Sequence, residues 1–436
     1  MSKRILLVMP PNGRAFSGNV RKNKCGMANL SLTTVASLIP DDWEVIYHDN
    51  RVSPVDYTAN VDVVGITALT SQATDAYRLA DGFQSQGTPV LMGGMHPTAL
   101  PDEALAHADA VVAGEAEYAL EKALRDCEKG QMEGVYRSDK LCDMQNMAIP
   151  RRDLLDRDMY VTGYHTIQAT RGCPYNCKYC AVTGVFGREF RTRPVQEVID
   201  EISTFDGRDF FFVDDNICGH TSYAKELFRQ LIPLRKTWGG QTSINFAEDE
   251  ELLDLYARSG GRYAFIGLET VSEEGLKNLN KSWSKAGQYK EAIQKIHRAG
   301  INVLASFIVG LDTDDKGIFD RVQRFCRECK VDAAQFHILT PLPGTRMYEE
   351  MDNDNRILDH NWESYHTGEC VIKPANMTPE ELEEGFYRLN KEFYSLPRVL
   401  HRTFRRPRGI VCRAAMNLGY RNRARRMPET AQCAST

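Results

Sequence analysis

The sequence predicts an α/β protein with a Rossmann-like parallel sheet first, a partial (β/α)6 barrel of the TIM type second, and a small helical region last. Two long stretches of the 436-residue chain alternate short apolar runs with amphipathic stretches of helical period. This alternation is typical of βαβ units and therefore of parallel sheets. A third signal is Thr378, a good helix cap that is followed by Pro379 in the first turn.

The Rossmann-like domain is expected over residues 1–134, and a linker with few periodic signals follows at residues 135–164. Ligands of such sheets bind beyond the carboxyl ends of the strands, so the loops there are candidate site segments. The expected strands are residues 5–8, 61–68, 90–92 and 110–112, and the expected helices are residues 27–38, 74–86 and 118–128.

The barrel is expected over residues 165–374, and the helical C-terminal region over residues 375–436. Six βα units in series make a partial parallel barrel, whose chemistry lies at the carboxyl ends of its strands. The expected strands are residues 166–169, 209–213, 241–246, 263–266, 303–308 and 333–338, with helices at residues 195–204, 223–234, 250–258 and 289–299.

Composition and termini narrow the class of protein. Hydrophobic residues make up 42% of the chain and charged residues 26%, as in an ordinary globular protein. No apolar run reaches the roughly 18 residues that span a bilayer. The first apolar run is too short for a secretory signal, so a cytoplasmic location is expected. The twelve cysteines are then expected to be free thiols rather than a disulfide framework.

Three of these cysteines lie on the loop after the first expected barrel strand. Cys173, Cys177 and Cys180 are separated by three and then two residues. Three thiolates on one short loop can ligate three irons of a 4Fe–4S cluster, and the fourth iron then stays open to a small chelating ligand. Arg171, Lys178 and backbone amides are expected to keep the thiolates deprotonated.

A zinc site and a second cysteine pair are the alternatives to this cluster loop. A zinc site would need a fourth ligand, for which Cys218 is a candidate, but zinc sites commonly use two C-x-x-C pairs and this spacing differs. Cys326 and Cys329 are three residues apart in a helical stretch and have no second pair near them. They are expected to pack in the core.

The stretch from Arg171 to Cys180, with Tyr179 as the aromatic residue before the third cysteine, resembles the cluster motif of the radical S-adenosylmethionine superfamily. The resemblance covers about residues 165–345. It implies that the three cysteines hold a 4Fe–4S cluster and that S-adenosylmethionine chelates the open iron. Cleavage by an electron from the cluster then gives the 5′-deoxyadenosyl radical.

Residues at expected strand ends extend this resemblance. Asp215 and Asn216, in a Val-Asp-Asp-Asn run that replaces the usual Gly-Gly-Glu pattern, are implied to bind the methionyl ammonium. Ser243 is implied to bind ribose or carboxylate, and Glu269 to contact S-adenosylmethionine. The open alternatives are a surface carboxylate for Asp215 and an exposed or salt-bridged carboxylate for Glu269. The implied S-adenosylmethionine contacts are therefore Tyr179, Asp215, Asn216, Ser243 and Glu269.

Residues 1–134 resemble the cobalamin-binding domain that precedes many radical S-adenosylmethionine domains. The runs that carry this resemblance are residues 5–11, 65–67, 93–101 and 113–117. Glycines would let the flat corrin ring approach the backbone, and hydroxyl groups would bind the nucleotide tail. The implied cobalamin contacts are Asn12, Thr67, Thr70, Ser71, Gly93, Gly94, Gly114 and Glu115. The alternative is a domain that keeps the fold without the cofactor.

The sequence departs from other cobalamin proteins because it has no D-x-H-x-x-G motif, whose histidine ligates cobalt. His96 stands in a different context, G-G-x-H-x-T. Cobalamin is therefore expected to bind without a protein imidazole, and His96 is expected to cap a helix or pack within its loop.

Together, cluster, S-adenosylmethionine and cobalamin imply a cobalamin-dependent radical C-methyltransferase that methylates an unactivated carbon. One alternative uses the same cofactors for cyclisation, oxidation or rearrangement without methyl transfer. A second alternative is a carrier of corrinoid or cluster that has no activity. No individual catalytic residue is predicted. The expected partners are a small-molecule or lipid-like substrate and an electron donor such as flavodoxin or ferredoxin, with no nucleic acid.

Charge is unevenly distributed along the chain. Residues 398–428 contain ten arginines and no acidic residue, although the whole chain carries a formal charge of −5. Interleaved apolar residues suit contact with an anionic membrane surface, where each basic residue is worth about 1 kcal/mol. A solvated tail or an acidic protein partner is an equal alternative.

Overall fold

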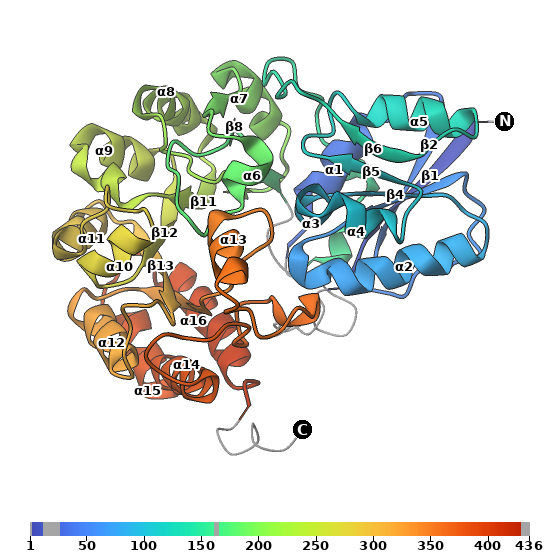
Figure 1. Cartoon of the computed structure of the whole chain (residues 1–436). Helices are drawn as coiled ribbons and strands as arrows, with labels where there is room; N and C mark the ends of the chain where they lie inside the picture. Colours follow the sequence, from blue (N-terminus) through green and yellow to red (C-terminus); the bar gives the residue numbers. More distant parts are fainter. Residues whose placement is uncertain (1, 12–26, 161–164, 429–436) are drawn as a thin grey trace.

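Two parallel sheets lie side by side, and the C-terminal helices pack below the second of them (Figure 1). The computed structural model describes residues 2–11, 27–160 and 165–428. Asn12, one of the expected cobalamin contacts, lies outside these ranges. The α/β class and the order of the three parts agree with the sequence prediction.

The first sheet has six parallel strands in the order β2-β1-β3-β4-β5-β6. Its four central strands are the apolar runs that the sequence predicts, and they are buried because helices cover both faces. The strands are β1 (Lys3–Met9), β2 (Trp43–Asp49), β3 (Val63–Thr67), β4 (Val90–Gly93), β5 (Ala110–Ala113) and β6 (Gly134–Arg137). The helices are α1 (Leu30–Ser37), α2 (Ala73–Ser85), α3 (Met95–Ala99), α4 (Pro101–Leu105) and α5 (Leu120–Glu128).

The second sheet also has six parallel strands, in the order β14-β13-β12-β11-β10-β7. Five of them match expected strands, whereas the strand expected at residues 241–246 lies at Thr237–Thr242, and Ile244–Glu248 form a 3-10 turn instead. Helices line the outer side of the sheet as in a partial barrel (Figure 1). The strands are β7 (Thr166–Ile167), β10 (Asp209–Phe212), β11 (Thr237–Thr242), β12 (Gly261–Glu269), β13 (Asn302–Val309) and β14 (Ala333–Ile338). The helices are α7 (Val195–Ser203), α8 (Thr221–Leu231), α9 (Glu250–Arg258), α10 (Glu273–Asn278), α11 (Tyr289–Arg298) and α12 (Ile318–Glu328).

A short antiparallel pair interrupts the regular alternation after β7. It consists of β8 (Thr170–Arg171) and β9 (Arg191–Thr192), in which Arg171 lies directly opposite Arg191. The loop between these strands carries the three clustered cysteines and α6 (Val182–Phe186). The pair therefore presents this loop at the carboxyl end of the barrel strands.

The C-terminal region is helical, as expected. Thr378 caps α14 (Pro379–Phe393) and forms a reciprocal capping box with Glu381. Before it lies α13 (Arg346–Asn353), and after it come α15 (Leu396–Phe404) and α16 (Ile410–Ala424), which pack against each other. None of the helices in the described ranges is long and apolar enough to cross a lipid bilayer.

The arginine-rich segment folds onto the barrel and is not a detached basic tail. Arg405 and Arg406 donate to the buried carboxylate of Asp332 at 2.9 and 2.8 Å. The Arg413 side chain is fully buried and donates to Asn302 and to backbone carbonyls. These arginines make internal contacts, because the buried Asp332 carboxylate needs a counter-charge and the buried carbonyls need hydrogen-bond donors.

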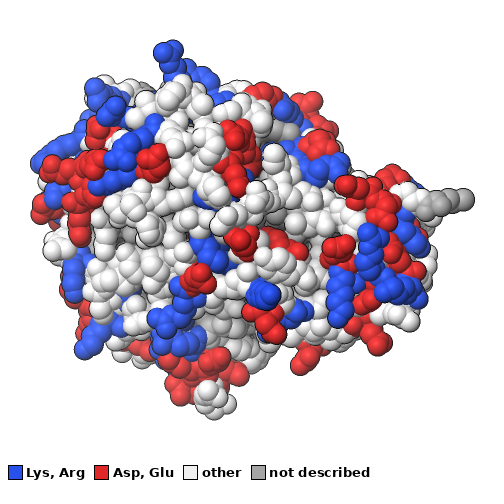
Figure 2. Space-filling model, turned by 90° about the horizontal axis from the view of Figure 1, so that it is seen from above, with Lys and Arg blue, Asp and Glu red and all other residues white. Residues whose placement is uncertain are grey.

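Figure 2 shows Lys and Arg side chains intermixed with Asp and Glu on the face seen from above, with uncharged surface between the groups. The separation of charge along the sequence is therefore not reproduced as separate acidic and basic regions on this face.

Candidate functional site

The cysteine loop is held against the barrel by backbone hydrogen bonds. Lys178 N–H donates to the Leu279 carbonyl at 3.0 Å, and Met347 N–H donates to the Lys178 carbonyl at 3.2 Å. Gly172 has φ +81°, and a Cβ there would lie 2.3 Å from the Glu189 carbonyl oxygen. Only glycine fits this turn, which delivers Cys173 to the end of the barrel.

The three clustered cysteines, Cys173, Cys177 and Cys180, are free thiols and half-buried. Burial raises the pKa of all three, that of Cys180 to about 12, and the Lys281 ammonium opposes this rise for Cys173 and Cys177. Lys281 itself is buried, with only 4% of its surface exposed. Its fixed positive charge favours the thiolate forms that iron requires.

The Tyr175 and Val182 backbone amides donate to Cys173 and Cys180 and favour their thiolates, as expected. The same expectation for Arg171 and Lys178 was wrong. Arg171 pairs with two carboxylates of the first domain, and Lys178 pairs with Glu350. Both charges are thus compensated elsewhere. Lys281 could not be recognised from the sequence, because a lysine in a loop between helices is ordinarily solvated.

The donor set of this loop fits a 4Fe–4S cluster, in which each thiolate binds its own iron. Within the described ranges, no three His, Cys, Asp or Glu side chains are grouped as ligands of a single metal ion. Cys218, the outside ligand of the zinc alternative, is buried in the barrel core, where its thiol hydrogen-bonds with Thr242.

Asp214 and Asp215 follow β10 and have different surroundings. One oxygen of Asp214 accepts from the Ala169 and Thr170 amides at 3.0 and 2.5 Å and so fixes the start of β8. Asp215 accepts from the Gly172 amide, while its other oxygen is buried without a partner among the described residues. Burial raises the pKa of Asp215 to about 6. An unpaired buried carboxylate oxygen beside the cysteine loop fits an ammonium ligand.

Asn216 and Ser243 are brought together at the ends of β10 and β11. The Asn216 side-chain oxygen accepts from the Ser243 amide at 3.2 Å and from the Thr242 hydroxyl at 3.3 Å. Ser243 also hydrogen-bonds with Tyr175 of the cysteine loop. The two expected contacts therefore line one rim of the site, next to that loop.

Tyr179 and Glu269, two further expected contacts, bond to each other. The Tyr179 hydroxyl donates to Glu269 at 2.8 Å, and Lys281 donates to the same carboxylate oxygen at 2.8 Å. Glu269 has φ +65°, in the left-handed region, and the register of β12 against β13 shifts there. A strained non-glycine residue at a strand end is typical of functional sites.

The Tyr175 and Trp283 rings, which the sequence did not single out, stack with centroids 3.5 Å apart. Lys281 lies over the Trp283 ring, 5.1 Å from its centroid. The buried Trp283 N–H hydrogen-bonds with the Cys177 thiol and lowers the pKa of that thiol, against the effect of burial. Because Trp283 is separated from the cysteine loop by about a hundred residues, sequence spacing carries no signal for this contact.

Two glycines of the first domain differ in the space around them. A Cβ on Gly94, at φ +101°, would clash with Thr67 Oγ1 and the Ala68 backbone at 2.7 to 2.9 Å. Gly94 is therefore required by contact with Thr67, another expected cobalamin residue. A Cβ on Gly114, at φ +88°, would meet nothing within 4 Å. Open space at Gly114 fits the approach of a flat ring.

The other expected cobalamin contacts lie along the same edge. Gly93 ends β4, and a Cβ on it would touch the Val112 carbonyl at 3.4 Å. Thr70 begins the 3-10 turn η1 (Thr70–Gln72), where it is buried, and Ser71 is half-buried beside it. These residues are at the carboxyl ends of β3 and β4, where ligands of parallel sheets bind.

His96 packs within the first domain, as expected for a residue that does not ligate cobalt. It is fully buried, and its Nε2 lies 3.0 Å from the Tyr77 hydroxyl and 3.3 Å from Glu103. Trp362, from the segment before α14, donates to the same Glu103 oxygen at 2.7 Å. The ring is thereby fixed at the boundary of the two domains.

The contacts of Glu115 differ from those expected of a residue that binds cobalamin. Its two carboxylate oxygens accept hydrogen bonds from Arg171, Arg191 and the Cys142 amide. The side chain is buried between the domains, with 4% exposed. The expected contact between this carboxylate and cobalamin is replaced by a contact between domains, since protein donors already occupy both oxygens.

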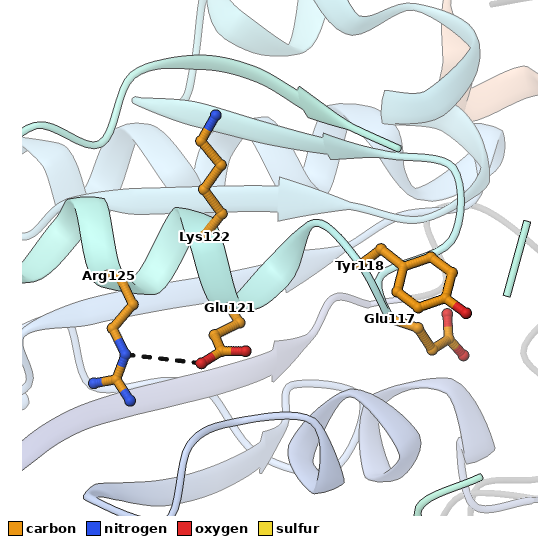
Figure 3. Close-up of a pocket in the computed structure, with 5 residues that line it drawn as sticks. All are labelled: Glu117, Tyr118, Glu121, Lys122 and Arg125. Carbon is orange, nitrogen blue, oxygen red and sulfur yellow. Dashed lines mark ion pairs between the residues drawn. The ribbon is translucent and has the colours of Figure 1, made fainter. Parts of the chain in front are cut away.

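A separate depression of about 390 Å³ lies beside α5 (Figure 3). Glu117 and Tyr118 precede the helix, whereas Glu121, Lys122 and Arg125 lie along it, with Arg125 paired to Glu121 at 4.0 Å. It is open and lined by charged groups, so we assign it no ligand.

Two families match the chain, in the order of the two sheets. The B12 binding domain matches residues 20–124, and the radical SAM superfamily matches residues 167–326. The matched ranges contain the glycine loops of the first domain and the three clustered cysteines of the second.

The chain is 33% identical over 390 residues to bacteriochlorophyllide d C-12(1)-methyltransferase of Chlorobaculum tepidum, covering 87% of this chain and 85% of that relative. It is 27% identical to hopanoid C-2 methylase of Rhodopseudomonas palustris, covering 83% and 73%. It is 26% identical to an anaerobic magnesium-protoporphyrin IX monomethyl ester cyclase of Cereibacter sphaeroides, covering 79% and 61%.

Solved structures with the same fold include OxsB, a cobalamin-dependent radical enzyme seen with aqua-cobalamin and S-adenosylmethionine bound. It aligns with a TM-score of 0.67 at 14% identity and covers 96% of this chain and 71% of its own. The methyltransferase TsrM from Kitasatospora setae, with cobalamin and a [4Fe-4S] cluster bound, aligns with a TM-score of 0.64 at 16% identity and covers 81% and 78%.

Proposed function

Because the chain belongs to the family of cobalamin-dependent radical S-adenosylmethionine enzymes, we propose that it is a C-methyltransferase acting on an unactivated carbon of a small molecule. Its cofactors are a 4Fe–4S cluster, S-adenosylmethionine and cobalamin. One observation carries the proposal: the glycine loops after β4 and β5 are joined to the cysteine loop through Glu115 and Arg171. Two cofactors bound at these loops would therefore lie near each other at the domain boundary.

The chain's own residues divide the work of holding the cofactors. Cys173, Cys177 and Cys180 would ligate the cluster, and Asp215 would accept the ammonium of S-adenosylmethionine through its unpaired oxygen. Gly114 would lie against cobalamin, where its missing side chain leaves space. When bound, the cluster supplies the electron that cleaves S-adenosylmethionine, and cobalamin supplies the methyl group.

Asn216, Ser243, Tyr179 and Glu269 would orient the remainder of S-adenosylmethionine. Asn216 and Ser243 are fixed to each other, and Tyr179 is fixed to Glu269, so each pair presents polar atoms in a preset direction. Preset polar groups lower the entropic cost of orienting a ligand, which is the main contribution that protein side chains make to radical chemistry on cofactors.

The proposal extends to the class of substrate and to the electron donor. Curated relatives include enzymes named for bacteriochlorophyllide and hopanoid methylation. These are large, mostly apolar ring systems, so we propose a lipid-like polycyclic substrate and a flavodoxin or ferredoxin as electron donor. The cyclase relative supports a second candidate, a radical cyclisation without methyl transfer.

We propose that the C-terminal helices contact the membrane through exposed apolar side chains, not through a detached basic tail. The outer faces of α15 and α16 expose five large apolar side chains, each between 48% and 83% exposed. On α15 they recur every fourth residue, so they form one stripe along the helix. The exposed Arg408 lies in the turn between the two helices. We propose that this C-terminal face rests on an anionic bilayer. Its apolar residues are Leu396, Leu400, Phe404, Val411 and Leu418.

The reaction is tested by its by-products. The reconstituted full chain is supplied with methyl-labelled S-adenosylmethionine, a chemical reductant, and bacteriochlorophyllide d or a hopanoid. A C-methyltransferase forms 5′-deoxyadenosine and S-adenosylhomocysteine in equal amounts and labels the product. Product formed with 5′-deoxyadenosine, but with neither label nor S-adenosylhomocysteine, would replace methyl transfer by cyclisation. A variant with alanine at all three clustered cysteines is the control for uncatalysed loss of label.

A further inference from the structure

Four charged side chains meet where the two domains touch. Glu115 and Glu117 come from the loop after β5, and Arg171 and Arg191 come from the β8–β9 pair. Arg191 forms two bonds to the Glu115 carboxylate, at 3.0 and 2.7 Å, and Arg171 adds a third at 3.2 Å. Arg171 also pairs with Glu117 at 2.6 Å. We call these four residues the domain clamp.

The clamp is buried and balanced in charge. Its side chains are between 4% and 11% exposed, and they comprise two carboxylates and two guanidinium groups. Burial alone would raise the pKa of Glu115, but the bonds and charges of Arg191 and Arg171 outweigh burial, and the pKa is lowered. The Glu115 carboxylate therefore stays ionised at neutral pH. Each domain alone would carry an uncompensated pair of like charges.

The strand pairing makes this compensation necessary. Arg171 and Arg191 are direct partners across the β8–β9 pair. Like charges at directly opposed positions destabilise an antiparallel pair unless a counter-charge lies between them. Glu115 supplies that charge from the other domain. The conformation of the strands that carry the cysteine loop is thus coupled to the position of the first domain.

A continuous path of bonds passes through the clamp. The Thr98 hydroxyl donates to the Gly94 carbonyl at 2.7 Å and accepts from the Gly114 amide at 2.9 Å. Glu115 follows Gly114 in the chain, and Arg171 is followed by Gly172 and Cys173. Covalent bonds and three hydrogen-bond contacts therefore connect the glycine loop after β4 to the first cysteine of the cluster motif.

Other polar contacts cross this boundary away from the cysteine loop, such as Trp362 to Glu103 and Arg78 to Glu363, whereas the contacts next to that loop are apolar and tight. Helix α3 lies against α6, and a Cβ on Gly344 would come within 3.1 Å of the Ala99 Cβ. Such packing limits how closely the two domains can approach each other, but it does not fix their relative orientation. The clamp fixes this orientation, because a bidentate arginine–carboxylate pair has a fixed plane and fixed bond lengths.

We propose that Glu115 is a positioning residue, which holds the cobalamin loops of the first domain at a fixed separation from the cluster loop through Arg171 and Arg191. The proposal rests on the proposed function for the identity of the two cofactors, whereas the clamp itself rests on the geometry of the chain. Methyl transfer and radical formation require both reacting groups within contact distance of one substrate, so a fixed separation is a condition of turnover.

The test compares Glu115→Gln with Glu121→Gln, a change of the same kind at an exposed position on α5. Hydrogen exchange is measured on the full chain without cofactors. Glu115→Gln is expected to speed exchange in residues 111–119 and 168–175 by roughly 10- to 100-fold, because a buried pair loses one charge. Glu121→Gln should match the wild type. Equal exchange in all three proteins would overturn the clamp.

A second arm separates positioning from simple stability. After reconstitution, the magnetic interaction between the reduced cluster and cobalt(II) is measured by electron paramagnetic resonance. Glu115→Gln is expected to retain iron and cobalamin but to show a weaker or more heterogeneous interaction than the wild type. An unchanged interaction would overturn the positioning role. A wild type that binds no cobalamin would instead overturn the proposed function. The hydrogen-exchange comparison would then still test whether the clamp joins the two domains.

Two further variants keep the test decisive if Glu115→Gln folds poorly. Glu115→Asp retains the charge on a side chain one methylene shorter, so it should fold and give intermediate exchange. Glu115→Gln combined with Arg191→Gln removes one charge of each sign. The double variant is expected to exchange no faster than Glu115→Gln alone, since the two residues act as one unit. Additive effects would contradict a shared clamp.

Discussion

Tyr179 donates a 2.8 Å hydrogen bond to Glu269 and thereby ties the cysteine loop to the end of β12. Lys281 donates to the same carboxylate oxygen. One buried oxygen thus receives a phenol and an ammonium, and the ammonium also lies near the thiols of Cys173 and Cys177. The charge on Lys281 is shared between Glu269 and the cluster ligands, so a change at Glu269 should reach the cluster.

Tyr179→Phe should leave the iron content unchanged and weaken S-adenosylmethionine binding. The change removes one buried hydrogen bond, worth about 1 kcal/mol, and frees the ring and Glu269 to move. The expected result is a KM for S-adenosylmethionine in 5′-deoxyadenosine formation that is about fivefold higher. Tyr57→Phe, at a tyrosine of the first domain with 36% exposed, is the matched control. Loss of iron in Tyr179→Phe would contradict a role in S-adenosylmethionine binding.

Replacing Cys173, Cys177 and Cys180 together by alanine should abolish both the 4Fe–4S absorbance and cleavage of S-adenosylmethionine. The three thiols supply every protein ligand that the motif implies, and reconstituted wild type should hold about four irons per chain. Iron and sulfide analysis after anaerobic reconstitution measures the outcome. A Cys326→Ala, Cys329→Ala variant is the control and should keep its iron, because these thiols pack in the barrel core. Four irons in the triple variant would refute the assignment.

Most of the fold could be predicted because buried parallel strands are continuous apolar runs. The β11 strand lies four residues earlier than expected, and the short β8–β9 pair was not predicted. The prediction also missed β2 and β6, which lie at the two edges of the first sheet. The β2 strand, from Trp43 to Asp49, mixes apolar and polar residues because one side of an edge strand meets solvent. The β6 strand has four residues, of which only Tyr136 is buried. Neither has a pattern that separates it from a loop.

Local motifs predicted the candidate site better than isolated residues did. The cysteine spacing and the glycine loops are short-range patterns, and the fold places both at carboxyl ends of strands. Lys281 and Trp283 reach the cysteine loop from a distant part of the chain, and only tertiary packing brings them there. Glu115 was predicted as a cobalamin contact, whereas its partners are Arg171 and Arg191, which depend on how the domains meet.

Cobalt(II) in the cobalamin-loaded protein should show no superhyperfine splitting from a protein nitrogen. His96, the histidine of the glycine loop, is fully buried, and its Nε2 contacts Tyr77 and Glu103. Moving this ring to cobalt would break those contacts and leave buried polar groups unpaired. Electron paramagnetic resonance of protein labelled with ¹⁵N-histidine and of unlabelled protein tests the prediction. A spectrum that changes with the label would show that a histidine ligates cobalt.

Asp332→Asn should lower the stability of the chain at neutral pH by about 3–5 kcal/mol, because Arg405 and Arg406 would lose a buried counter-charge. Burial works to raise the pKa of Asp332, but the bond from His297 and the charges of His297, Arg405 and Arg406 prevail and hold it well below its usual range. A lowered pKa means that the ionised carboxylate stabilises the folded state.

The pH dependence of this effect follows from its sign. The contribution of Asp332 is fully present above its ordinary pKa of 3.8 and is lost as the pH falls below that value towards the folded pKa. Urea unfolding of wild type and Asp332→Asn should therefore differ most between about pH 5 and 7, and the difference should begin to shrink as the pH falls below 3.8. Asp320→Asn, at an exposed position on α12, should match the wild type throughout. A difference independent of pH would rule out the charge as its cause.

Leu400→Ser combined with Phe404→Ser should reduce binding of the full chain to vesicles of phosphatidylglycerol and phosphatidylcholine. Both side chains lie on the exposed stripe of α15, at 48% and 65% exposure, so their loss removes insertion energy without disturbing the core. Vesicle flotation is expected to fall about tenfold, since each large side chain contributes on the order of 1 kcal/mol at a membrane interface. Arg425→Gln, at an exposed arginine after α16, tests the electrostatic part and should have a smaller effect that salt removes. Equal flotation of wild type and the double serine variant would exclude the C-terminal face as the membrane contact, and a monomer formed from a wild-type dimer would assign the face to a second copy of the chain.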